Sequence, residues 1–468
     1  MTIKSDEHLR TIASAAGAGR GGYGSVAMGG WGNWAGNQTV AGITVERPGD
    51  TEDVAAVVRR AVASGSRVKA VGAGHSFSGI ARPEQVMLDL SALQGLHTFD
   101  RDSGLVTVGA GTSLRRLNDL LAGVGLAMPN LGDIDAQSLA GAISTGTHGT
   151  GAKYGGLSAA VAGLEMVMAD GSVLTCSPAE QPEMWSAARV GLGALGVITR
   201  VTLRCVPLFA LRAEEGPMGL DELLDRFDEL VASSDHFEAY WFPHTGRALT
   251  KRNARLPLAE GLDRLPGWKE WLNDEFLSNR VFGWVVELGK RKPSLIPAAN
   301  GLAARALGSR SFTDLSFKVF TSPRRVRFRE MELAVPRPAA AVAIREVVDA
   351  VESSGMHIAF PVELRVAAAD DIPLSTASGR DSAYLAFHVP ASVDHREYFR
   401  LVARVLDGYG ARPHWGKIHE LDAELLRTRY PRFDEFVRLR DAVDPRGLFS
   451  NGYLDRVLGP APDSPPAG

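Results

Sequence analysis

Residues 138–151 (SLAGAISTGTHGTG) constrain the fold more than any other segment of the chain. Their density of glycine and hydroxyl residues excludes a regular helix or strand along the whole segment. Such a segment can offer backbone N–H groups to a phosphate. A plain surface loop is the alternative, but Leu139, Ala142 and Ile143 alternate with the small residues in a way that exposed loops rarely show. We therefore expect contact between this segment and a cofactor.

A second glycine-rich segment lies at residues 71–79 (VGAGHSFSG), where a predicted strand ends in small residues. Gly72, Ala73 and Gly74 would let backbone N–H groups approach an anion closely. His75 follows, and a lone histidine is more often a capping or core residue than a functional one. The segment alone does not decide between these interpretations.

The letters of the motif G-x-G-x-x-G occur at Gly191, Gly193 and Gly196, but their context is wrong for a Rossmann loop. Such a loop follows a strand and leads into a helix N-terminus, which receives the pyrophosphate. Here the glycines follow MWSAARV and precede the strand-like VITRVTL. The sequence therefore does not predict a nicotinamide dinucleotide site.

The chain has 468 residues, of which 45% are apolar, and this length predicts two domains. Residues 40–205 alternate predicted strands and helices, and one helix is predicted behind an Asp50/Thr51 cap, where Val54, Val57, Val58, Ala61 and Val62 recur at helical spacing. After Pro207 the sequence changes to charged helices and aromatic strands. We expect a flexible glycine-rich segment at 1–30, a first domain at 31–207, a second at 208–411, a return to the first at 412–459 and a disordered tail at 460–468.

Composition excludes several classes of function. A net charge of -3 without a Lys/Arg block argues against nucleic-acid binding. Cys176 and Cys205 lie in apolar, strand-like stretches, which predicts buried thiols and neither a disulfide framework nor a metal site. The first residues do not resemble a signal peptide, and no apolar stretch of about 18 residues could cross a bilayer, so we expect a cytoplasmic protein.

The second half of the chain supplies candidate reactive groups. Glu363 and Arg365 are two apart on a strand pattern and would project from the same face. A solvated ion pair is the alternative, although the intervening apolar residues leave a cleft plausible. His388 is a third candidate, while His414 and His419 do not have the spacing of metal ligands.

Separated motifs in this order resemble the aldonolactone oxidase and alditol oxidase group of the vanillyl-alcohol oxidase flavoprotein superfamily. They are AVGAGHSFSGIA, STGTHGTG, VELRVAAAD and RPHWGK. The resemblance covers about residues 31–459 and is strongest to actinobacterial L-gulono-1,4-lactone and D-arabinono-1,4-lactone oxidoreductases. It implies an α+β fold with a PCMH-type FAD-binding domain and an α+β cap domain over the flavin.

In this family pattern, a ring nitrogen of the residue matching His75 bonds covalently to the flavin 8α-methyl group, which raises the flavin potential. A related group that oxidises lipid-linked arabinofuranose precursors lacks this histidine, so His75 argues against that function. The other FAD contacts that the resemblance implies are Gly72, Ala73, Gly74, Ser76, Asp133, Ser138, Gly141, Thr145, Thr147, His148, Val197, His414 and Lys417. The implied catalytic residues are Glu363, Arg365, His388 and Lys417, and these four with Asp133 are the implied substrate contacts.

The expected reaction is oxidation of an aldono-1,4-lactone at its C2 hydroxyl, with hydride transfer to flavin N5 and an ascorbate-type product. By resemblance, Glu363 binds substrate hydroxyls and orients Arg365, Arg365 contacts the reacting oxygen, and Lys417 lies near the flavin pyrimidine edge. Negative charge develops on the substrate oxygen and then on the flavin, so Arg365 and Lys417 are the candidates for stabilising it. The identity of the base stays open.

Two alternatives are an alditol oxidase that forms an aldose and H2O2, and a catalytically silent flavoprotein. Asp133, where alditol oxidases tend to have serine, and the Val-Pro-Ala that follows His388 both weaken the polyol alternative. Gly132 occupies the position where residue size gates oxygen access in the superfamily. A glycine there leaves room for O2, but the choice between O2 and another electron acceptor stays open.

Overall fold

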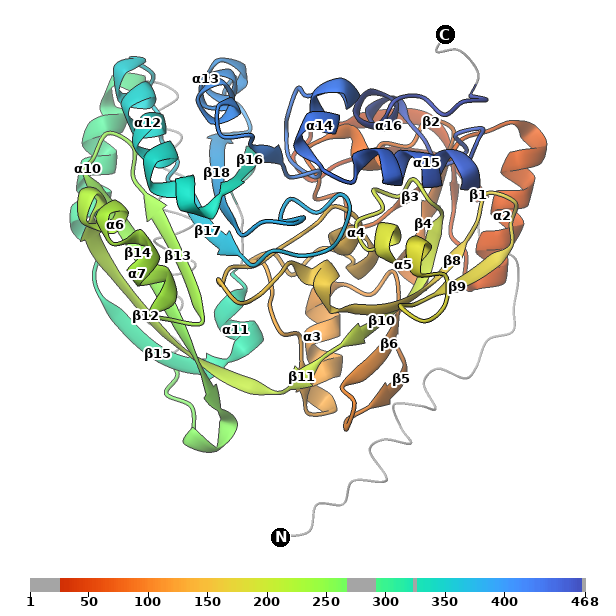
Figure 1. Cartoon of the computed structure of the whole chain (residues 1–468), viewed down its shortest axis with the longest axis horizontal. Helices are drawn as coiled ribbons and strands as arrows, with labels where there is room; N and C mark the ends of the chain where they lie inside the picture. Colours follow the sequence, from red (N-terminus) through yellow and green to blue (C-terminus); the bar gives the residue numbers. More distant parts are fainter. Residues whose placement is uncertain (1–25, 267–291, 323–325, 465–468) are drawn as a thin grey trace.

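The computed structural model describes residues 26–266, 292–322 and 326–464. Figure 1 shows two units side by side, an N-terminal unit built from residues 26–207 and 414–464 and a central unit built from residues 209–413. The predicted flexible segment falls mainly on residues 1–25, which lie outside the described residues. Val26–Gly32 instead form strand β1, because their backbone pairs with β2 (Thr39–Glu46) across a bulge between Gly29 and Gly30.

The N-terminal unit contains two main sheets. The first has the order β1-β2-β4-β3, with β4 at Val86–Asp89 and β3 at Val68–Val71. Helix α2 (Thr51–Ser64) packs on this sheet through Val54, Val58 and neighbouring residues, and the predicted Asp50 cap accepts from the Asp53 N–H. The periodicity of the sequence therefore predicted this element correctly.

The second sheet has the order β5-β6-β10-β8-β9. Its strands are β5 (Leu96–Asp100), β6 (Leu105–Gly109), β10 (Val197–Arg204), β8 (Val161–Val167) and β9 (Val173–Cys176). The accompanying helices are α3 (Leu114–Gly123), α4 (Leu139–Ser144) and α5 (Pro182–Ala188). Strand β7 (Leu126–Ala127) pairs with β11 (Val206–Pro207). This short pair ends the unit at Pro207, where the composition of the sequence changes. Cys176 and Cys205 are buried, as predicted.

The central unit is an eight-stranded sheet of order β15-β12-β14-β13-β17-β18-β16-β19. Its strands are β12 (Phe209–Gly219), β13 (His236–Trp241), β14 (Arg247–Pro257), β15 (Arg310–Leu315), β16 (Phe328–Pro336), β17 (Val362–Ala367), β18 (Ser382–Pro390) and β19 (Arg412–Pro413). Its helices are α6 (Leu220–Asp225), α7 (Phe227–Ala232), α10 (Ile296–Ala306), α11 (Ser316–Phe320), α12 (Ala340–Ser353) and α13 (Arg396–Asp407). Among the described helices, none has an apolar stretch long enough to cross a membrane.

The two faces of this sheet differ in chemistry because side chains alternate along each strand. In β16, Met331 and Leu333 belong to an apolar core shared with α6, α7, α12 and α13. Glu330 and Glu332 therefore project from the opposite face. The same alternation in β17 places Leu364 in the core. We call the opposite side of the sheet, which carries the charged residues, the polar face.

The C-terminal segment returns to the N-terminal unit through α14 (Ala423–Arg429), α15 (Phe433–Val443) and α16 (Gly452–Leu458). Apolar residues of these helices join the core that also contains β6, β8 and β10. The predicted disordered tail is ordered further than expected, since Ala461 is 3% exposed and the Asp463 N–H donates to the Pro445 carbonyl. Residues 465–468 lie outside the described residues.

Candidate functional site

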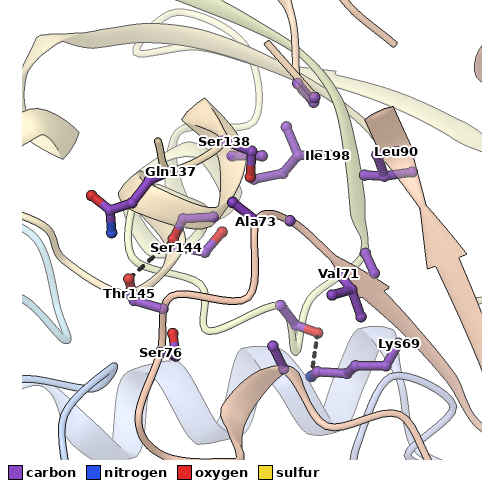
Figure 2. A pocket seen from close by; sticks show the side chains of 18 of the residues that line it. Lys69, Val71, Ala73, Ser76, Leu90, Gln137, Ser138, Ser144, Thr145 and Ile198 are labelled. Atoms are coloured by element: carbon purple, nitrogen blue, oxygen red, sulfur yellow. Dashed lines mark hydrogen bonds between the residues drawn. The ribbon is translucent and has the colours of Figure 1, made fainter. Parts of the chain in front are cut away.

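A cavity of about 320 Å³ lies inside the N-terminal unit, between its glycine-rich segments (Figure 2). Residues 72–76 enter it from the end of β3, residues 136–145 enter it around α4, and residues 191–196 enter it just before β10. A volume of this size is in the range of small-molecule sites. The two segments that the sequence singled out thus meet at one cavity.

The backbone around the cavity is suited to an anion. Among the described residues, no protein acceptor takes a hydrogen bond from the backbone N–H groups of residues 73–76, which line the cavity. Gly74 has φ +70°, a conformation that glycine adopts without strain. Gly72 packs so closely that a Cβ there would lie 2.1 Å from Ser138 Oγ. These open donors fit the phosphates of a dinucleotide such as FAD.

Most of the predicted cofactor residues line this cavity, but not all of them. Those that do are Gly72, Ala73, Gly74, His75, Ser76, Ser138, Gly141 and Thr145. Val197 does not, because its side chain is packed in the core with α2. Its neighbours Gly196 and Ile198 line the cavity instead, which is the consequence of alternation along β10.

Two contributors to the cavity were not predicted from the sequence. The segment 191–196 was set aside as a Rossmann loop, and its context confirms that rejection, since it joins α5 to β10. It nevertheless lines the cavity. Lys69 also lines it and donates to the carbonyls of Gly193 at 3.2 Å and Phe449 at 3.0 Å. Burial lowers the pKa of Lys69 to about 7. A lysine in a short strand gives no sign of burial at the sequence level.

His75 lies where the cavity meets the C-terminal segment. The Phe77 N–H donates to the Gly416 carbonyl at 2.7 Å, and Ser78 Oγ donates to the Trp415 carbonyl at 2.8 Å. These bonds hold the predicted RPHWGK motif against the His75 loop. The Trp34 ring stacks on the His75 imidazole with centroids 5.6 Å apart. Burial, and then the charge of Lys417, lower the pKa of His75.

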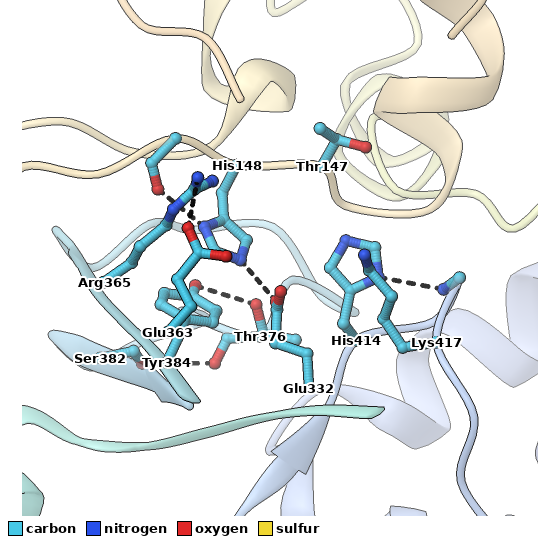
Figure 3. A network of polar contacts seen from close by, with 12 residues as sticks. Thr147, His148, Glu332, Glu363, Arg365, Thr376, Ser382, Tyr384, His414 and Lys417 are labelled. Carbon is cyan, nitrogen blue, oxygen red and sulfur yellow. Dashed lines mark hydrogen bonds and ion pairs between the residues drawn. The ribbon is translucent and has the colours of Figure 1, made fainter. Parts of the chain in front are cut away.

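Glu363 and Arg365 are joined on the polar face, as their spacing predicted (Figure 3). Arg365 Nη2 lies 2.5 Å from Glu363 Oε1, which also accepts from Tyr240 Oη at 3.1 Å. Asp133 approaches from the N-terminal unit, with Oδ1 3.8 Å from Arg365 Nη2. Both strand residues are buried, so this is not the solvated ion pair considered as the alternative.

A second ion pair supports Arg365 and was missed at the sequence level. Glu238 Oε2 lies 3.2 Å from Arg365 Nε, and Glu238 Oε1 lies 3.1 Å from Lys251 Nζ. Burial alone would lower the pKa of Arg365, but Glu363, Glu238 and Asp133 raise it well above its ordinary value. The guanidinium is therefore a permanent cation.

Lys417 and His388 share one buried carboxylate. Lys417 Nζ pairs with Glu330 Oε2, and His388 Nε2 lies 3.6 Å from Glu330 Oε1. Burial would lower the pKa of Lys417, but Glu330 and then Glu332 raise it above its ordinary value. Burial likewise opposes ionisation of Glu330, yet Lys417 and His388 lower its pKa to about 2. Glu330 is absent from the predicted set.

The predicted cofactor residues Thr147, His148 and His414 lie outside the cavity lining, in the polar network between the two units (Figure 3). His148 Nε2 lies 2.6 Å from Glu332 Oε1, its Nδ1 lies 2.8 Å from the Gly149 carbonyl, and its ring stacks on Tyr384 at 3.6 Å. Both ring nitrogens of His148 thus face oxygens of the protein. His414 Nδ1 accepts from the Gly416 N–H at 3.0 Å, and burial lowers the His414 pKa to about 4.

The end of the glycine-rich segment 138–151 joins the N-terminal unit to the central unit directly. The Gly151 N–H donates to the Val366 carbonyl at 2.8 Å, and the Val366 N–H donates to Thr150 Oγ1 at 3.2 Å. His236 Nδ1 bonds the Thr150 carbonyl at 2.7 Å. Residues 138–151 therefore have two roles: the first part lines the cavity and the second fixes the central sheet over it. Among the described residues, no group of His, Cys, Asp or Glu could hold a metal ion.

Comparison with known proteins agrees with this architecture. Residues 43–177 match the model of an FAD binding domain, and residues 201–457 match that of the D-arabinono-1,4-lactone oxidase family. The chain is 43% identical to the L-gulono-1,4-lactone dehydrogenase of Mycobacterium tuberculosis (strain H37Rv) over 92% of this chain and 99% of that protein. It is 33% identical to L-gulonolactone oxidase of Bos taurus, over 91% and 97%, and 31% identical to alditol oxidase of Streptomyces sp., over 91% and 98%.

The fold also matches a solved structure of low sequence similarity. Cholesterol oxidase from B. sterolicum superimposes with a TM-score of 0.79 at 18% identity, over 93% of this chain and 97% of that one. At this identity the likeness concerns the fold alone. The family match spans more than half of the chain and the relatives span nearly all of it. The chain therefore belongs to the D-arabinono-1,4-lactone oxidase family of FAD-dependent oxidoreductases, within the vanillyl-alcohol oxidase superfamily.

Proposed function

We propose that this protein oxidises an aldono-1,4-lactone at its C2 hydroxyl, with Arg365 and Lys417 stabilising the negative charge that develops on the reacting oxygen. The observation that carries this proposal is that Arg365 projects from the polar face, while Lys417, in the segment that reaches the His75 loop, pairs with Glu330 of the same face. Fixed cations in a buried site stabilise such charge more than water does, since they need no reorganisation. Matches to lactone dehydrogenases and oxidases support the substrate class.

The charges on the polar face favour an uncharged substrate. In the ion-pair network around Arg365 and Lys417, the carboxylates Asp133, Glu238, Glu330 and Glu363 outnumber the lysine and arginine side chains, Lys251, Arg365 and Lys417. Burying a further anion among these carboxylates would be unfavourable. Neutral lactones, whose hydroxyls can donate to carboxylates, fit this face better than aldonates or sugar phosphates.

FAD would be held by the backbone of residues 72–76, by residues 138–145 and by residues 191–196. When bound, it supplies a two-electron acceptor that takes the hydride from the substrate carbon. The protein's part is to bind the lactone hydroxyls through Glu363 and Asp133 and to keep the reacting oxygen beside cations. Because nearby carboxylates raise the pKa of Lys417, we assign this residue to charge stabilisation and not to proton removal.

We further propose that the flavin is attached to His75 through a ring nitrogen. Burial and Lys417 lower the pKa of His75, so the imidazole is neutral at physiological pH and keeps a lone pair for bond formation. Stacking on Trp34 restricts the ring. Flavin fluorescence should stay with the denatured wild-type band and leave the His75→Ala band. Release of the flavin from both would contradict the attachment.

The substrate is tested by steady-state rates with L-gulono-, L-galactono- and D-arabinono-1,4-lactone against xylitol, sorbitol and an aldonate, each with O2 and with an artificial electron acceptor. We expect turnover of a lactone and none of the aldonate. Arg365→Met should lower kcat/KM by at least about 100-fold, whereas Arg345→Met, on the outer helix α12, should not. A polyol turned over faster than every lactone would favour alditol oxidation instead. The rates with the two acceptors decide between oxidase and dehydrogenase.

A further inference from the structure

Glu330 occupies a position from which it contacts two predicted substrate residues at once. It lies in β16 directly opposite His388 of β18, so the two side chains emerge side by side on the polar face. One carboxylate oxygen pairs with Lys417 Nζ and the other lies 3.6 Å from His388 Nε2. The Glu330 side chain is only 5% exposed. Both contacts are therefore largely shielded from solvent.

Lys417 depends on its neighbours for its charge. Its side chain is 17% exposed, and its ammonium lies over the Phe77 ring at 5.2 Å. The charged and titratable groups that face it from the surrounding elements are Glu330 and Glu332 of β16, His388 of β18, Asp133, His414 and His75. Of these, Glu330 is in direct contact and has the largest favourable effect. Removing its charge would leave an ammonium ion in a largely desolvated place.

We propose that Glu330 is a positioning residue, which keeps Lys417 as an ammonium ion and holds Lys417 and His388 at a fixed separation on the polar face. This inference rests on the proposed function, because that function assigns Lys417 and His388 to the reacting substrate. The inference adds that Lys417 and His388 are both held by one residue of β16. The pairing of β16 with β18 fixes Glu330 beside His388, and the Ile418 N–H donates to the Glu330 carbonyl at 2.9 Å, which ties the loop that carries Lys417 to β16.

The direct test is competitive acetylation of the holoenzyme by acetic anhydride across pH, with the label on each lysine read by peptide mass spectrometry. Only the unprotonated amine reacts, so the labelling midpoint reports the charge of one lysine. In Glu330→Gln we expect the midpoint of Lys417 to fall by about 1–3 pH units, the effect of losing one close opposite charge. The midpoint of Lys251 should stay unchanged.

Glu238→Gln is the matched control. Glu238 lies on the same face and pairs with Lys251 as Glu330 pairs with Lys417. This control should therefore lower the Lys251 midpoint and leave that of Lys417 in place. If Lys417 has the same midpoint in wild type and Glu330→Gln, the proposal is wrong. Should Glu330→Gln fail to fold, Glu330→Asp keeps the charge on a shorter side chain and should give a smaller shift, and no shift in it would also overturn the proposal.

Kinetics separate a positioning role from a merely structural one. In Glu330→Gln, kcat should fall as pH rises through the lowered Lys417 midpoint, while the double variant Glu330→Gln/Lys417→Arg should lose this limb because a guanidinium stays charged. A wild-type pH profile in Glu330→Gln would contradict the proposal. The labelling needs no substrate, so it tests Glu330 even if the lactone panel shows that the proposed function is wrong.

Discussion

Replacing Gly72 by alanine tests whether the two glycine-rich segments form the cavity by direct contact. An ideal Cβ at residue 72 would lie 2.1 Å from Ser138 Oγ and 3.2 Å from Ser138 Cβ. The first distance is far inside van der Waals contact, so one of the segments must move. Over-packing of this kind costs about 1–3 kcal/mol. In a unit of this size the melting temperature should fall by about 3–9 °C.

The partner of the clash can be removed separately. Ser138 precedes α4 but makes no side-chain capping hydrogen bond, so Ser138→Ala alone should change stability little. In the double variant the remaining 3.2 Å contact needs only a small adjustment. The double variant should therefore melt close to wild type, which corresponds to a coupling about equal to the 1–3 kcal/mol that Gly72→Ala costs alone.

Differential scanning calorimetry and flavin retention on gel filtration measure the two consequences. Gly123→Ala is the matched control, because Gly123 ends helix α3 and a Cβ there would meet no atom within 4 Å. It should leave the melting temperature unchanged or raise it slightly. Gly72→Ala should also release flavin more readily. Equal melting temperatures for Gly72→Ala and the double variant would refute direct contact between the segments.

Three further predictions concern buried charges. The pKa of Lys69 in the folded protein is about 7, below the unfolded value of about 10.4, so the unfolded state binds more protons between these pH values. The free energy of unfolding of wild type, measured in urea, should thus rise from pH 7 to 10 relative to that of Lys69→Met. Parallel curves for the two proteins would contradict the lowered pKa of Lys69. His148→Phe should cost about 3–5 kcal/mol by leaving Glu332 without its partner, and adding Glu332→Leu should recover most of it in the same assay; additive losses would show that the two residues do not interact. The folded pKa of Glu330 is about 2, so its contribution is present above the unfolded value of about 4.3 and is lost as pH falls toward 2. As the pH falls from 5 to 2, the free energy of unfolding of Glu330→Gln should therefore decrease less than that of wild type, by up to about 3 kcal/mol. Superimposable curves of unfolding free energy against pH would argue against this pKa.

The sequence predicted the elements whose signal is local. The helix after Asp50 and the strand that carries Glu363 and Arg365 have periodic apolar residues, and both form as predicted. In FREMELAVP of β16, the alternation of apolar with acidic residues places Glu330 and Glu332 on one face, in the same way as Glu363 and Arg365. Those carboxylates could have been found from the sequence but were not.

Other features depend on contacts between distant segments, which no local pattern encodes. Val197 and Ile198 are both apolar residues in one strand, and only the position of α2 decides which of them is turned away from the cavity. The resemblance implies that His148 is an FAD contact, and only the fold shows that its protein neighbours come from β16 and β18. The cost of burying Lys69 is likewise visible only once the carbonyls that it reaches are in place.

The division of the central sheet into two faces has a consequence for how substrate range can change over evolution or in the laboratory. Odd and even positions of β16, β17 and β18 serve different purposes, one set packing the core and the other contacting the site. Mutations at alternate codons can therefore vary recognition while leaving the apolar core intact. A library that replaces ion-paired residues of the polar face together would leave the apolar core intact, whereas single replacements there would leave a buried partner charge unpaired and lose foldable members.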